Sequence, residues 1–265
     1  MQASKIASPA AYGEVVSSPR TESPIMKIAG STALVTGANR GLGARIVNEL
    51  LATDVTKVYA TARTLGSIAG SSVIADPRVE PLALDITDPA SVRAAAAAAD
   101  DVTVLVNNAG VLAFGGVLDG DLDSFERDLR TNYLGTLRVT REFVPVLERN
   151  APAAVVNVLT LIALAPVPPM AGYSASKAAA HSMTQALRAE LRGRGIEVLG
   201  AYPGGIDTDM LAGVEADKAP PELVAQRIVA ALAAGHGTVF PDEASAAAGA
   251  VYLTDPVRLE QMLAG

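Results

Sequence analysis

The sequence predicts an α/β protein with one doubly wound parallel sheet of about seven strands and helices on both faces. Three observations support this prediction. Short apolar runs alternate with longer helical segments from residue 27 onward. The runs are continuously apolar, which is typical of strands that are covered on both faces. The chain has 265 residues, 50% of them hydrophobic, so it can bury a sizeable core in a single domain.

Seven segments are expected to be strands, and each ends where a turn or a helical pattern begins. They are 32–37 (TALVTG), 57–63 (KVYATAR), 79–85 (VEPLALD), 102–110 (VTVLVNNAG), 153–160 (AAVVNVLT), 196–204 (IEVLGAYPG) and 237–240 (GTVF).

Five longer segments between the strands are expected to be helices: 41–53, 89–99, 122–149, 171–193 and 221–234. Asp88 before Pro89 and Asp255 before Pro256 are each typical of an N-cap followed by proline at the first helical position. The stretch SVRAAAAAA at 91–99 is rich in the best helix former, so we expect a helix packed closely on the sheet.

The two ends of the chain do not follow this alternation. Residues 1–25 are rich in Ser, Pro and Ala and lack periodicity, so a mobile extension is expected there and a single domain over 26–265. A helical tail is expected at the C-terminus (EASAAAGAVYLTDPVRLEQMLAG, 243–265). It either packs on a neighbouring subunit or closes the core of its own chain.

Composition argues against several classes of function. The formal net charge of −7 argues against a nucleic-acid partner, because such a partner is bound by basic surfaces. Without cysteine, and with His181 and His236 far apart, neither a disulfide framework nor a metal site is expected. No apolar run is long enough for a membrane span and no compact apolar leader is present, so the expected location is the cytoplasm.

A glycine-rich turn, TGANRGLG, connects the first expected strand to the first expected helix through Gly37, Gly41 and Gly43. Such glycines let backbone N–H groups approach a phosphate, and the helix N-terminus adds a favourable dipole. The spacing is not the commoner G-x-G-x-x-G, and glycines also make ordinary tight turns. The position between strand and helix favours a dinucleotide site.

Two arginines near this turn indicate which dinucleotide is bound. An acidic residue at the end of the second strand would favour NAD, whereas an arginine accepts the 2′-phosphate of NADP. That strand ends with Arg63 and carries no acid, and Arg40 lies inside the glycine turn. Two guanidiniums suit bidentate recognition of a phosphate, so NADP(H) is favoured. The alternative is that both are solvated surface residues.

Tyr173 and Lys177 are four residues apart in the alanine-rich stretch AGYSASKAAAHS. Positions i and i+4 lie on one face of a helix, so both side chains can reach one bound molecule. They are either a packing tyrosine beside a lysine that extends to solvent, or a catalytic pair. An ammonium group near a phenol, whose ordinary pKa is about 10, favours the phenolate and makes tyrosine a usable acid and base.

Five motifs occur in order: TGANRGLG, NNAG at 107–110, TNYLGT around Asn132, YSASK at 173–177 and YPGGIDT at 202–208. Together they resemble the short-chain dehydrogenase/reductase family over roughly residues 27 to 240. The resemblance implies a Rossmann-like fold, a nicotinamide cofactor and oxidoreductase activity. With Arg40 and Arg63, the chain is similar to NADP-preferring carbonyl reductases.

The resemblance also implies roles for single residues. Tyr173 would be the general acid/base, Lys177 would lower its pKa and hold the nicotinamide ribose, and Asn132 would anchor a water that relays protons through Lys177. The cofactor would be bound by Gly37, Asn39, Arg40, Gly41, Leu42, Gly43, Arg63, Asp85, Ile86, Asn107, Ala109, Gly110, Tyr173, Lys177, Pro203, Gly204, Ile206 and Thr208.

Within this set, the resemblance assigns Asp85 to the adenine, and Asn107 and Ala109 to the adenosine ribose. Ile206 and Thr208 would contact the carboxamide and the diphosphate region. If the other motifs were absent from the chain, the simpler interpretation would be that Asp85 caps a turn and that Asn132 caps or bridges backbone groups inside its helix.

The chain departs from the family pattern at residue 160. The family usually has a serine thirteen residues before the tyrosine, and this chain has Thr160 there. Its hydroxyl can still hydrogen-bond the substrate carbonyl and the tyrosine oxygen, while its methyl group stiffens χ1 and takes space. Thr160 is therefore either a working substitute in an altered pocket or the mark of a weakened site.

The expected substrate pocket is apolar and open. The stretch LIALAPVPPMAG at 161–172 carries no charge, and only about residues 207–220 remain to cover the site. Without a basic side chain to meet a carboxylate or phosphate, a neutral hydrophobic ketone, aldehyde or secondary alcohol is favoured. The residues expected to line this pocket are Phe114, Ile162, Val167, Tyr202, Met210 and Leu211. The alternative is that half of these residues simply pack in the core.

The main expectation is therefore an NADPH-dependent carbonyl reductase in which Tyr173 protonates the substrate oxygen and Thr160 orients it. Two alternatives stay open: an NAD-preferring secondary alcohol dehydrogenase, and an NADP-binding sensor or scaffold with weak or lost turnover. The family is usually dimeric or tetrameric through long helices that correspond to 122–149 and 171–193, so a homodimer or homotetramer is expected.

Overall fold

A computed structural model describes residues 26–69 and 75–264. The extension expected at residues 1–25 lies outside the described residues. In the part of the chain that the structure describes, no helix combines the length and apolar character needed to cross a membrane.

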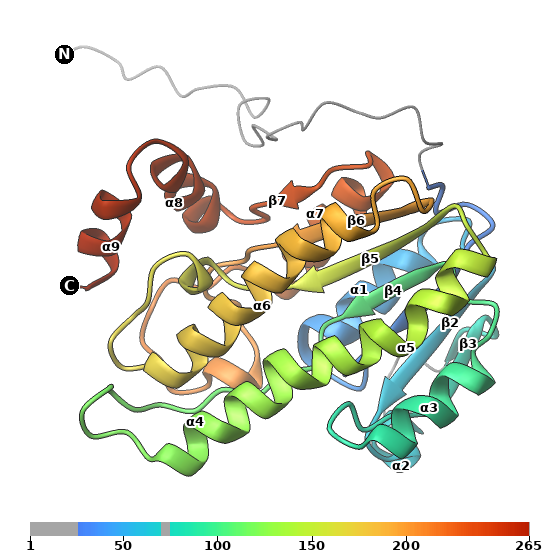
Figure 1. Ribbon diagram of the computed structural model, residues 1–265, viewed down its shortest axis with the longest axis horizontal. Helices are drawn as coiled ribbons and strands as arrows, with labels where there is room; N and C mark the ends of the chain where they lie inside the picture. Colours follow the sequence, from blue (N-terminus) through green and yellow to red (C-terminus); the bar gives the residue numbers. More distant parts are fainter. Residues whose placement is uncertain (1–25, 70–74, 265) are drawn as a thin grey trace.

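The seven expected strands form one parallel sheet in the order β3-β2-β1-β4-β5-β6-β7, which confirms the predicted fold class (Figure 1). The chain winds outward in one direction from β1 and then returns to begin again at β4, beside β1. Ligands of such sheets bind outside the carboxyl ends of the strands at this switch point. The strands are β1 (Thr32–Val35), β2 (Lys57–Ala62), β3 (Val79–Ala83), β4 (Val104–Asn107), β5 (Ala153–Val158), β6 (Ile196–Ala201) and β7 (Thr238–Val239).

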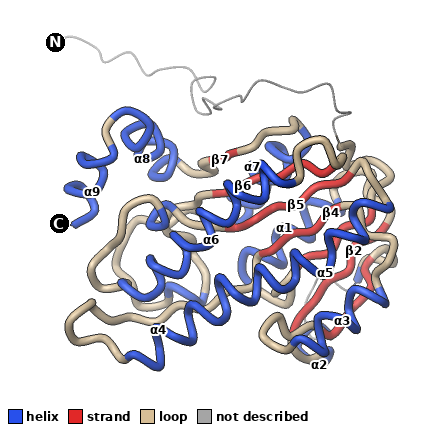
Figure 2. Tube along the Cα trace, viewed as in Figure 1, coloured by secondary structure: helices blue, strands red, loops and turns tan. Residues whose placement is uncertain are grey.

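Helices cover both faces of the sheet, as Figure 2 shows in blue against the red strands. Helices α1 and α7 pack on one face, and α3, α5 and α6 on the other. The helices are α1 (Gly41–Leu51), α2 (Leu65–Ala69), α3 (Pro89–Ala98), α4 (Leu122–Asp128), α5 (Thr136–Arg149), α6 (Ala171–Glu190), α7 (Pro221–Ala233), α8 (Glu243–Thr254) and α9 (Pro256–Ala264).

Two hydrophobic clusters hold these layers together. Ile46 of α1 and Ile228 of α7 lie in the first cluster, and Val92, Phe143 and Leu187 bring α3, α5 and α6 into the second. Every residue of β1, β4 and β5 is buried, which accounts for the largely apolar sequences of these strands. Burying one large aliphatic side chain contributes about 1.5–3 kcal/mol, so the two clusters supply most of the driving force for folding.

The helix expected over 122–149 is interrupted. Between α4 and α5 the chain forms a π-helical segment at Leu129–Gly135, which contains Asn132. Such segments are rare and often lie at functional sites, because the extra residue per turn re-aims the side chains around it. The close fit of Gly135 against Ile86 keeps this segment near the end of β3, since a Cβ on Gly135 would lie 3.0 Å from the Ile86 side chain.

Helix ends follow local chemistry. The Asp88 carboxylate accepts hydrogen bonds from the N–H groups of Ala90 and Ser91, as the sequence predicts for the start of α3. Asp255 likewise accepts from the Arg258 N–H at 3.0 Å, at the start of α9. The five-residue helix α2 was not expected, because it is too short to show a periodic pattern.

The C-terminal helices close the core of their own chain. Leu259 of α9 is fully buried against Ala248 of α8 and against Leu161 and Ala165, which lie in the segment that follows β5. Asp242 caps α8 and forms a reciprocal capping box with Ser245. The Arg188 guanidinium of α6 donates to the carbonyl oxygens of Val198 and Gly237, which ties the short β7 to the rest of the sheet.

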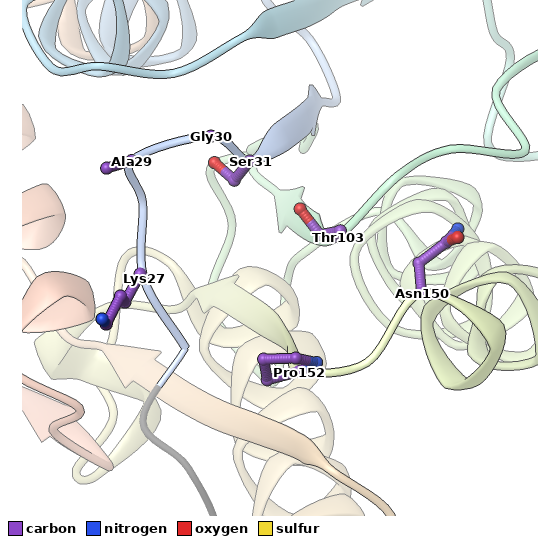
Figure 3. Close-up of a pocket in the computed structure, with 7 residues that line it drawn as sticks. All are labelled: Lys27, Ala29, Gly30, Ser31, Thr103, Asn150 and Pro152. Carbon is purple, nitrogen blue, oxygen red and sulfur yellow. The ribbon is translucent and has the colours of Figure 1, made fainter.

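A cavity of about 310 Å³ lies at the amino ends of β1, β4 and β5 (Figure 3). The glycine turn and the Tyr173–Lys177 pair lie at the opposite, carboxyl end of the sheet. The residues that line this cavity are Lys27, Ala29, Gly30, Ser31, Thr103, Asn150 and Pro152.

Candidate active site

The glycine turn is shaped by residues that leave no room for side chains. Gly37 and Gly41 have positive φ angles of 65° and 54°, which favour glycine. A Cβ on Gly43 would collide with the Gly37 carbonyl oxygen and the Asn108 side chain. The start of α1 is therefore pressed against the end of β1, with its first N–H groups without intrahelical partners.

Thr36 and Asn108 fix this turn to the neighbouring strand. The Thr36 hydroxyl accepts hydrogen bonds from the N–H groups of Asn108 and Ala109, both at 2.9 Å. The Asn108 amide donates to the carbonyl oxygens of Thr36 at 2.9 Å and Gly37 at 3.2 Å. The two strand ends at the switch point are thus joined by side chains as well as by the sheet.

Tyr173 and Lys177 lie on one face of α6 and are both buried. The Lys177 ammonium donates a hydrogen bond to the carbonyl oxygen of Val158, the last residue of β5, at 2.9 Å. It also lies 5.8 Å from the centre of the Tyr173 ring. This excludes a lysine that extends to solvent and places the pair at the carboxyl end of the sheet.

Burial dominates the electrostatics of this pair. It raises the pKa of the Tyr173 phenol above its ordinary value, and the carboxylate of Asp128 raises that pKa further. Burial lowers the pKa of Lys177 from 10.5 to about 8, because the charged form loses hydration. Lys177 is therefore still largely protonated at neutral pH.

Asn132 connects the π-helical segment to the loop after β4 and to α6. Its Oδ1 accepts from the Val111 N–H, and its Nδ2 donates to the Val111 carbonyl and to the Ser176 hydroxyl, all at 2.9 Å. A Cβ on Gly110 would lie 3.0 Å from Asn132 Oδ1 and 3.7 Å from Lys177 Nζ. The NNAG motif is thus brought against the tyrosine–lysine pair.

Thr160 lies two residues after Val158 and is buried at the start of a short 3₁₀ turn, Leu161–Ala163. Its hydroxyl donates to the carbonyl oxygen of Pro203 at 3.3 Å, and the Leu161 N–H donates to the same oxygen at 2.8 Å. The hydroxyl keeps lone pairs for a further contact.

The segment after β6 lies over the glycine turn. A Cβ on Gly41 would meet the Thr208 side chain at 3.6 Å. Arg40 of the glycine turn and Asp209 of the segment after β6 form an exposed ion pair at 2.9 Å. At the base of the segment, the Gly204 N–H donates to the buried carboxylate of Asp242 at 2.8 Å.

Ile206 pairs with Ala219 in an isolated parallel bridge, which closes residues 207–218 into a loop. The short segment that the sequence predicts as a cover over the substrate is therefore a loop whose two ends are joined by this bridge. It contains a 3₁₀ turn at Asp209–Leu211.

Two of the residues expected to bind the cofactor, Asn107 and Asp85, form hydrogen bonds within the protein. The Asn107 side chain donates to Thr140 at 3.0 Å and to Asn157 at 2.9 Å in the core, away from the glycine turn. The Asp85 carboxylate accepts from the Thr87 N–H and hydroxyl at 2.8 and 2.7 Å, so it caps a turn with one oxygen. Arg63 is exposed at the end of β2.

The expected pocket walls do not all lie together. Phe114 and Met210 are 56% and 45% exposed, while Ile162, Val167 and Leu211 are partly buried. Tyr202 instead faces a separate cavity of about 180 Å³, where its hydroxyl lies 2.7 Å from Nδ1 of His181. Burial raises the Tyr202 pKa to about 12.

Sequence reasoning missed Asn108 and Asp242. Asn108 was within the NNAG motif, and the two-residue period of a strand places it on the face opposite to Asn107. Asp242 precedes a Ser at the capping-box position, but its bond to Gly204 joins residues 38 positions apart. The described residues contain no group of three His, Asp or Glu side chains that could hold a metal ion.

A parallel sheet with a glycine turn at its switch point, and a buried tyrosine–lysine pair beside it, defines a Rossmann-like α/β protein of the dinucleotide-binding class. The chain belongs to the short chain dehydrogenase family, whose model matches residues 31–219.

Individual relatives agree with this assignment. Short chain dehydrogenase pigC from Monascus ruber is 31% identical over 70% of this chain. This chain spans 66% of the pigC length and 46% of the length of a second fungal relative. Pig (Sus scrofa) carbonyl reductase (NADPH) 2 is 31% identical over 75% of this chain and 80% of its own.

A solved structure extends the likeness to nearly the whole fold. A short chain dehydrogenase from Burkholderia cenocepacia J2315, in complex with NADP, has a TM-score of 0.84 and 37% identity to this chain. The match covers 90% of this chain and 99% of that one.

Proposed function

We propose that this protein reduces a neutral, hydrophobic ketone or aldehyde to an alcohol with NADPH, and that Tyr173 donates the proton. The observation that carries the proposal is the arrangement around the phenol. Lys177 shares its helical face and is bonded to the end of β5 at Val158. Thr160 follows two residues later, and Gly110 lies close to both the Lys177 ammonium group and the Asn132 side chain. The reverse oxidation of a secondary alcohol would use the same groups.

The glycine turn fits a nicotinamide dinucleotide. Because Gly43 has no side chain to collide with the Gly37 carbonyl oxygen, the start of α1 lies against the end of β1, where its first N–H groups can face a diphosphate. The first N–H groups of α1, with Asn39, Gly41 and Thr208, would hold the phosphates. The bound cofactor supplies the hydride that reduces the carbonyl carbon.

The arginines support NADP(H). Arg63 is exposed at the end of β2, where no acid competes for the 2′-phosphate. Arg40 is paired with Asp209, but both side chains are exposed, and such a pair contributes only about 0–1 kcal/mol. A phosphate can therefore take the place of that carboxylate. The NADP in the Burkholderia relative and the name of the pig relative point the same way.

Four side chains of the protein then have separate roles in proton transfer to the substrate. The buried phenol of Tyr173 stays protonated and donates its proton to the substrate oxygen. The Lys177 ammonium offsets the phenolate charge that remains. Thr160 orients the substrate oxygen, and Asn132 fixes the loop after β4 and anchors the water that returns a proton through Lys177.

The substrate class follows from what surrounds this centre. The 3₁₀ turn after Thr160 and the loop up to Met170 carry no charge, and Phe114 is exposed on the loop that a parallel bridge at Gly115 and Met170 joins to it. An uncharged, apolar carbonyl compound suits such walls.

The test is a Tyr173→Phe variant assayed with NADPH and a panel of aryl and alkyl ketones. We expect kcat to fall by about 10²–10⁴-fold, because the proton donor is lost, while NADPH binding measured by fluorescence is unchanged. Tyr252→Phe, which removes a phenol hydroxyl on α8, is the matched control and should keep full activity.

The same assay separates the rival functions. Faster initial rates with NADH than with NADPH would indicate an NAD-preferring alcohol dehydrogenase. NADPH binding without turnover of any substrate would indicate a sensor or scaffold. Turnover that survives in Tyr173→Phe would contradict the proposed mechanism.

A further inference from the structure

Asp242 lies between β7 and α8, and the proton-transfer scheme above gives it no role. It is 3% exposed and caps α8, where its Oδ1 accepts a hydrogen bond from the Ser245 N–H at 2.9 Å. Its Oδ2 accepts a second bond, at 2.8 Å, from the N–H of Gly204, which lies 38 positions earlier in the chain. A helix cap needs only one oxygen, so the start of α8 does not explain the second bond.

The peptide group between Pro203 and Gly204 connects this carboxylate to the candidate active site. The N–H of that group is the one that donates to Asp242. Its carbonyl oxygen accepts from the Thr160 hydroxyl at 3.3 Å and from the Leu161 N–H at 2.8 Å. Because a peptide group is planar and nearly rigid, a bond that fixes the N–H also fixes the direction of the carbonyl. A carboxylate on the N–H side also polarises the carbonyl and strengthens the bonds that it accepts.

Glycine at position 204 makes this anchor both possible and necessary. A Cβ on Gly204 would lie 3.0 Å from Asp242 Oδ1 and 3.6 Å from the Ala244 side chain, so the first turn of α8 can approach the backbone only because residue 204 is glycine. Two successive glycines, Gly204 and Gly205, also leave the backbone free to rotate. Without the bond to Asp242, the peptide group could turn its carbonyl away from the segment that follows β5.

We propose that Asp242 is a positioning residue for Thr160, on which it acts through the Pro203–Gly204 peptide group. This inference rests on the function proposed above, in which Thr160 orients the substrate oxygen. While the carbonyl is held in place, the Thr160 hydroxyl and the Leu161 N–H bind one fixed oxygen, and the threonine side chain keeps one orientation. Loss of the anchor lets the hydroxyl take several orientations, and small misplacements of such a group slow catalysis.

The experiment is a double-mutant cycle of Asp242→Asn and Thr160→Val. It measures kcat and KM with one aryl ketone, and NADPH binding by fluorescence. Thr160→Val keeps the shape of the side chain without its hydroxyl, and it should lower kcat by about 10²-fold. Asparagine has one acceptor oxygen, which cannot serve both N–H groups, so Asp242→Asn should lower kcat by about tenfold with NADPH binding unchanged. In the double variant, Asp242→Asn should cause no further loss, because the hydroxyl on which it acts is absent.

A matched control separates this role from the capping of α8. A loosened α8 would also reach the Thr160 turn, because Ala248 of that helix packs with Leu161. Ser245→Ala removes the hydroxyl that completes the capping box and leaves the Asp242–Gly204 bond in place, so kcat should stay at the wild-type value. Asp242→Ser keeps a good capping residue but supplies only one oxygen, so it should lower kcat as Asp242→Asn does. It replaces the asparagine variant if that protein is not recovered folded.

The outcomes distinguish this inference from the proposed function. Turnover that survives in Tyr173→Phe contradicts the function itself. If Tyr173→Phe is inactive but the losses in Asp242→Asn and Thr160→Val multiply in the double variant, Asp242 acts independently of Thr160 and only the inference is overturned. An unchanged kcat in either single variant overturns it as well. So does weaker NADPH binding at an unchanged kcat in Asp242→Asn, because the acid would then serve the cofactor segment after β6.

Discussion

Each polar side chain of the candidate site joins two elements that are distant in the sequence. Lys177 ties α6 to β5, Asn132 ties the π-helical segment to the loop after β4, and Thr160 ties the end of β5 to Pro203. The same bonds that satisfy buried polar groups therefore fix the reacting groups in place. The cost is a buried ammonium group whose hydration is lost.

Lys177→Met tests how much the burial of this ammonium group destabilises the fold. We expect the variant without cofactor to be more stable than the wild type by about 1–3 kcal/mol at pH 7, because a buried charge with a depressed pKa opposes folding. The folded pKa of about 8 lies below the ordinary 10.5, so the unfolded chain binds more protons between these values. Wild-type stability should rise over that range of pH, and the advantage of the variant should shrink.

Urea denaturation at several pH values measures both effects. Lys27→Met, which removes an exposed ammonium group, is the control and should show neither. A Lys177→Met protein that is less stable than the wild type at pH 7 would show that the bond to Val158 outweighs the lost hydration.

At this scale, the motifs placed Tyr173 and Lys177 on one helix and the glycine turn between a strand and a helix, as the structure has them. They did not reveal the division between Asn107, which is in the core, and Asn108, which holds the turn. Asp128 was hidden in the charged run ERDLR, which is typical of a solvated helix face. Only the packing of α4 on α6 shows that one of these charges is buried.

At the scale of elements, the alternation of strands and helices was visible in the sequence, but helix interruptions were not. The segment expected as one helix over 122–149 contains a π-helical segment at Leu129–Gly135, from which the Asn132 side chain bonds to Val111 and Ser176. The expected helix over 171–193 ends at Glu190, three residues before Gly193 adopts a φ of 81°. The tail was predicted to be helical, but its packing partner required the structure.

Leu259→Ala tests the contribution of that tail. Leu259 is fully buried against Leu161 and Ala165, so the truncation should cost about 2–5 kcal/mol. Because this cluster supports the turn after Thr160, turnover should fall as well. Thermal unfolding and kcat measure the two effects. Leu253→Ala, on the exposed side of α8, should change neither, and an equally small effect at Leu259 would mean that α9 contributes little to the fold.

At the scale of the whole molecule, the sheet was the most predictable feature, since all seven strands were expected and all are present and parallel. The order of the strands was not predicted from the sequence and comes from the structure. The assembly of subunits could not be predicted in the same way, because the hydrophobic pattern of one chain does not distinguish an interface from a core. The structure adds exposed apolar residues on and before α4, namely Val117, Leu118 and Leu122.

We expect the protein to form a homodimer or homotetramer that covers these side chains, since monomers rarely expose such patches. Leu122→Asp should therefore lower the mass measured by light scattering after gel filtration, while the fold is kept because Leu122 is 74% exposed. Val257→Asp, an exposed position on α9, is the control and should leave the mass unchanged. A wild-type protein with the mass of one chain would refute the expectation.

The short β7 has a consequence for how the molecule behaves in concentrated solution. An edge strand presents unpaired backbone groups that can template the growth of aggregates. Here the edge is only Thr238–Val239, the chain turns at once into the capped helix α8, and the Gly237 carbonyl is already bonded to Arg188 and to the Gly200 N–H. At this end of the sheet, little free edge is left for a strand from another molecule. At the β7 edge, the arginine that ties this strand to the sheet therefore also limits pairing with a strand of a second molecule.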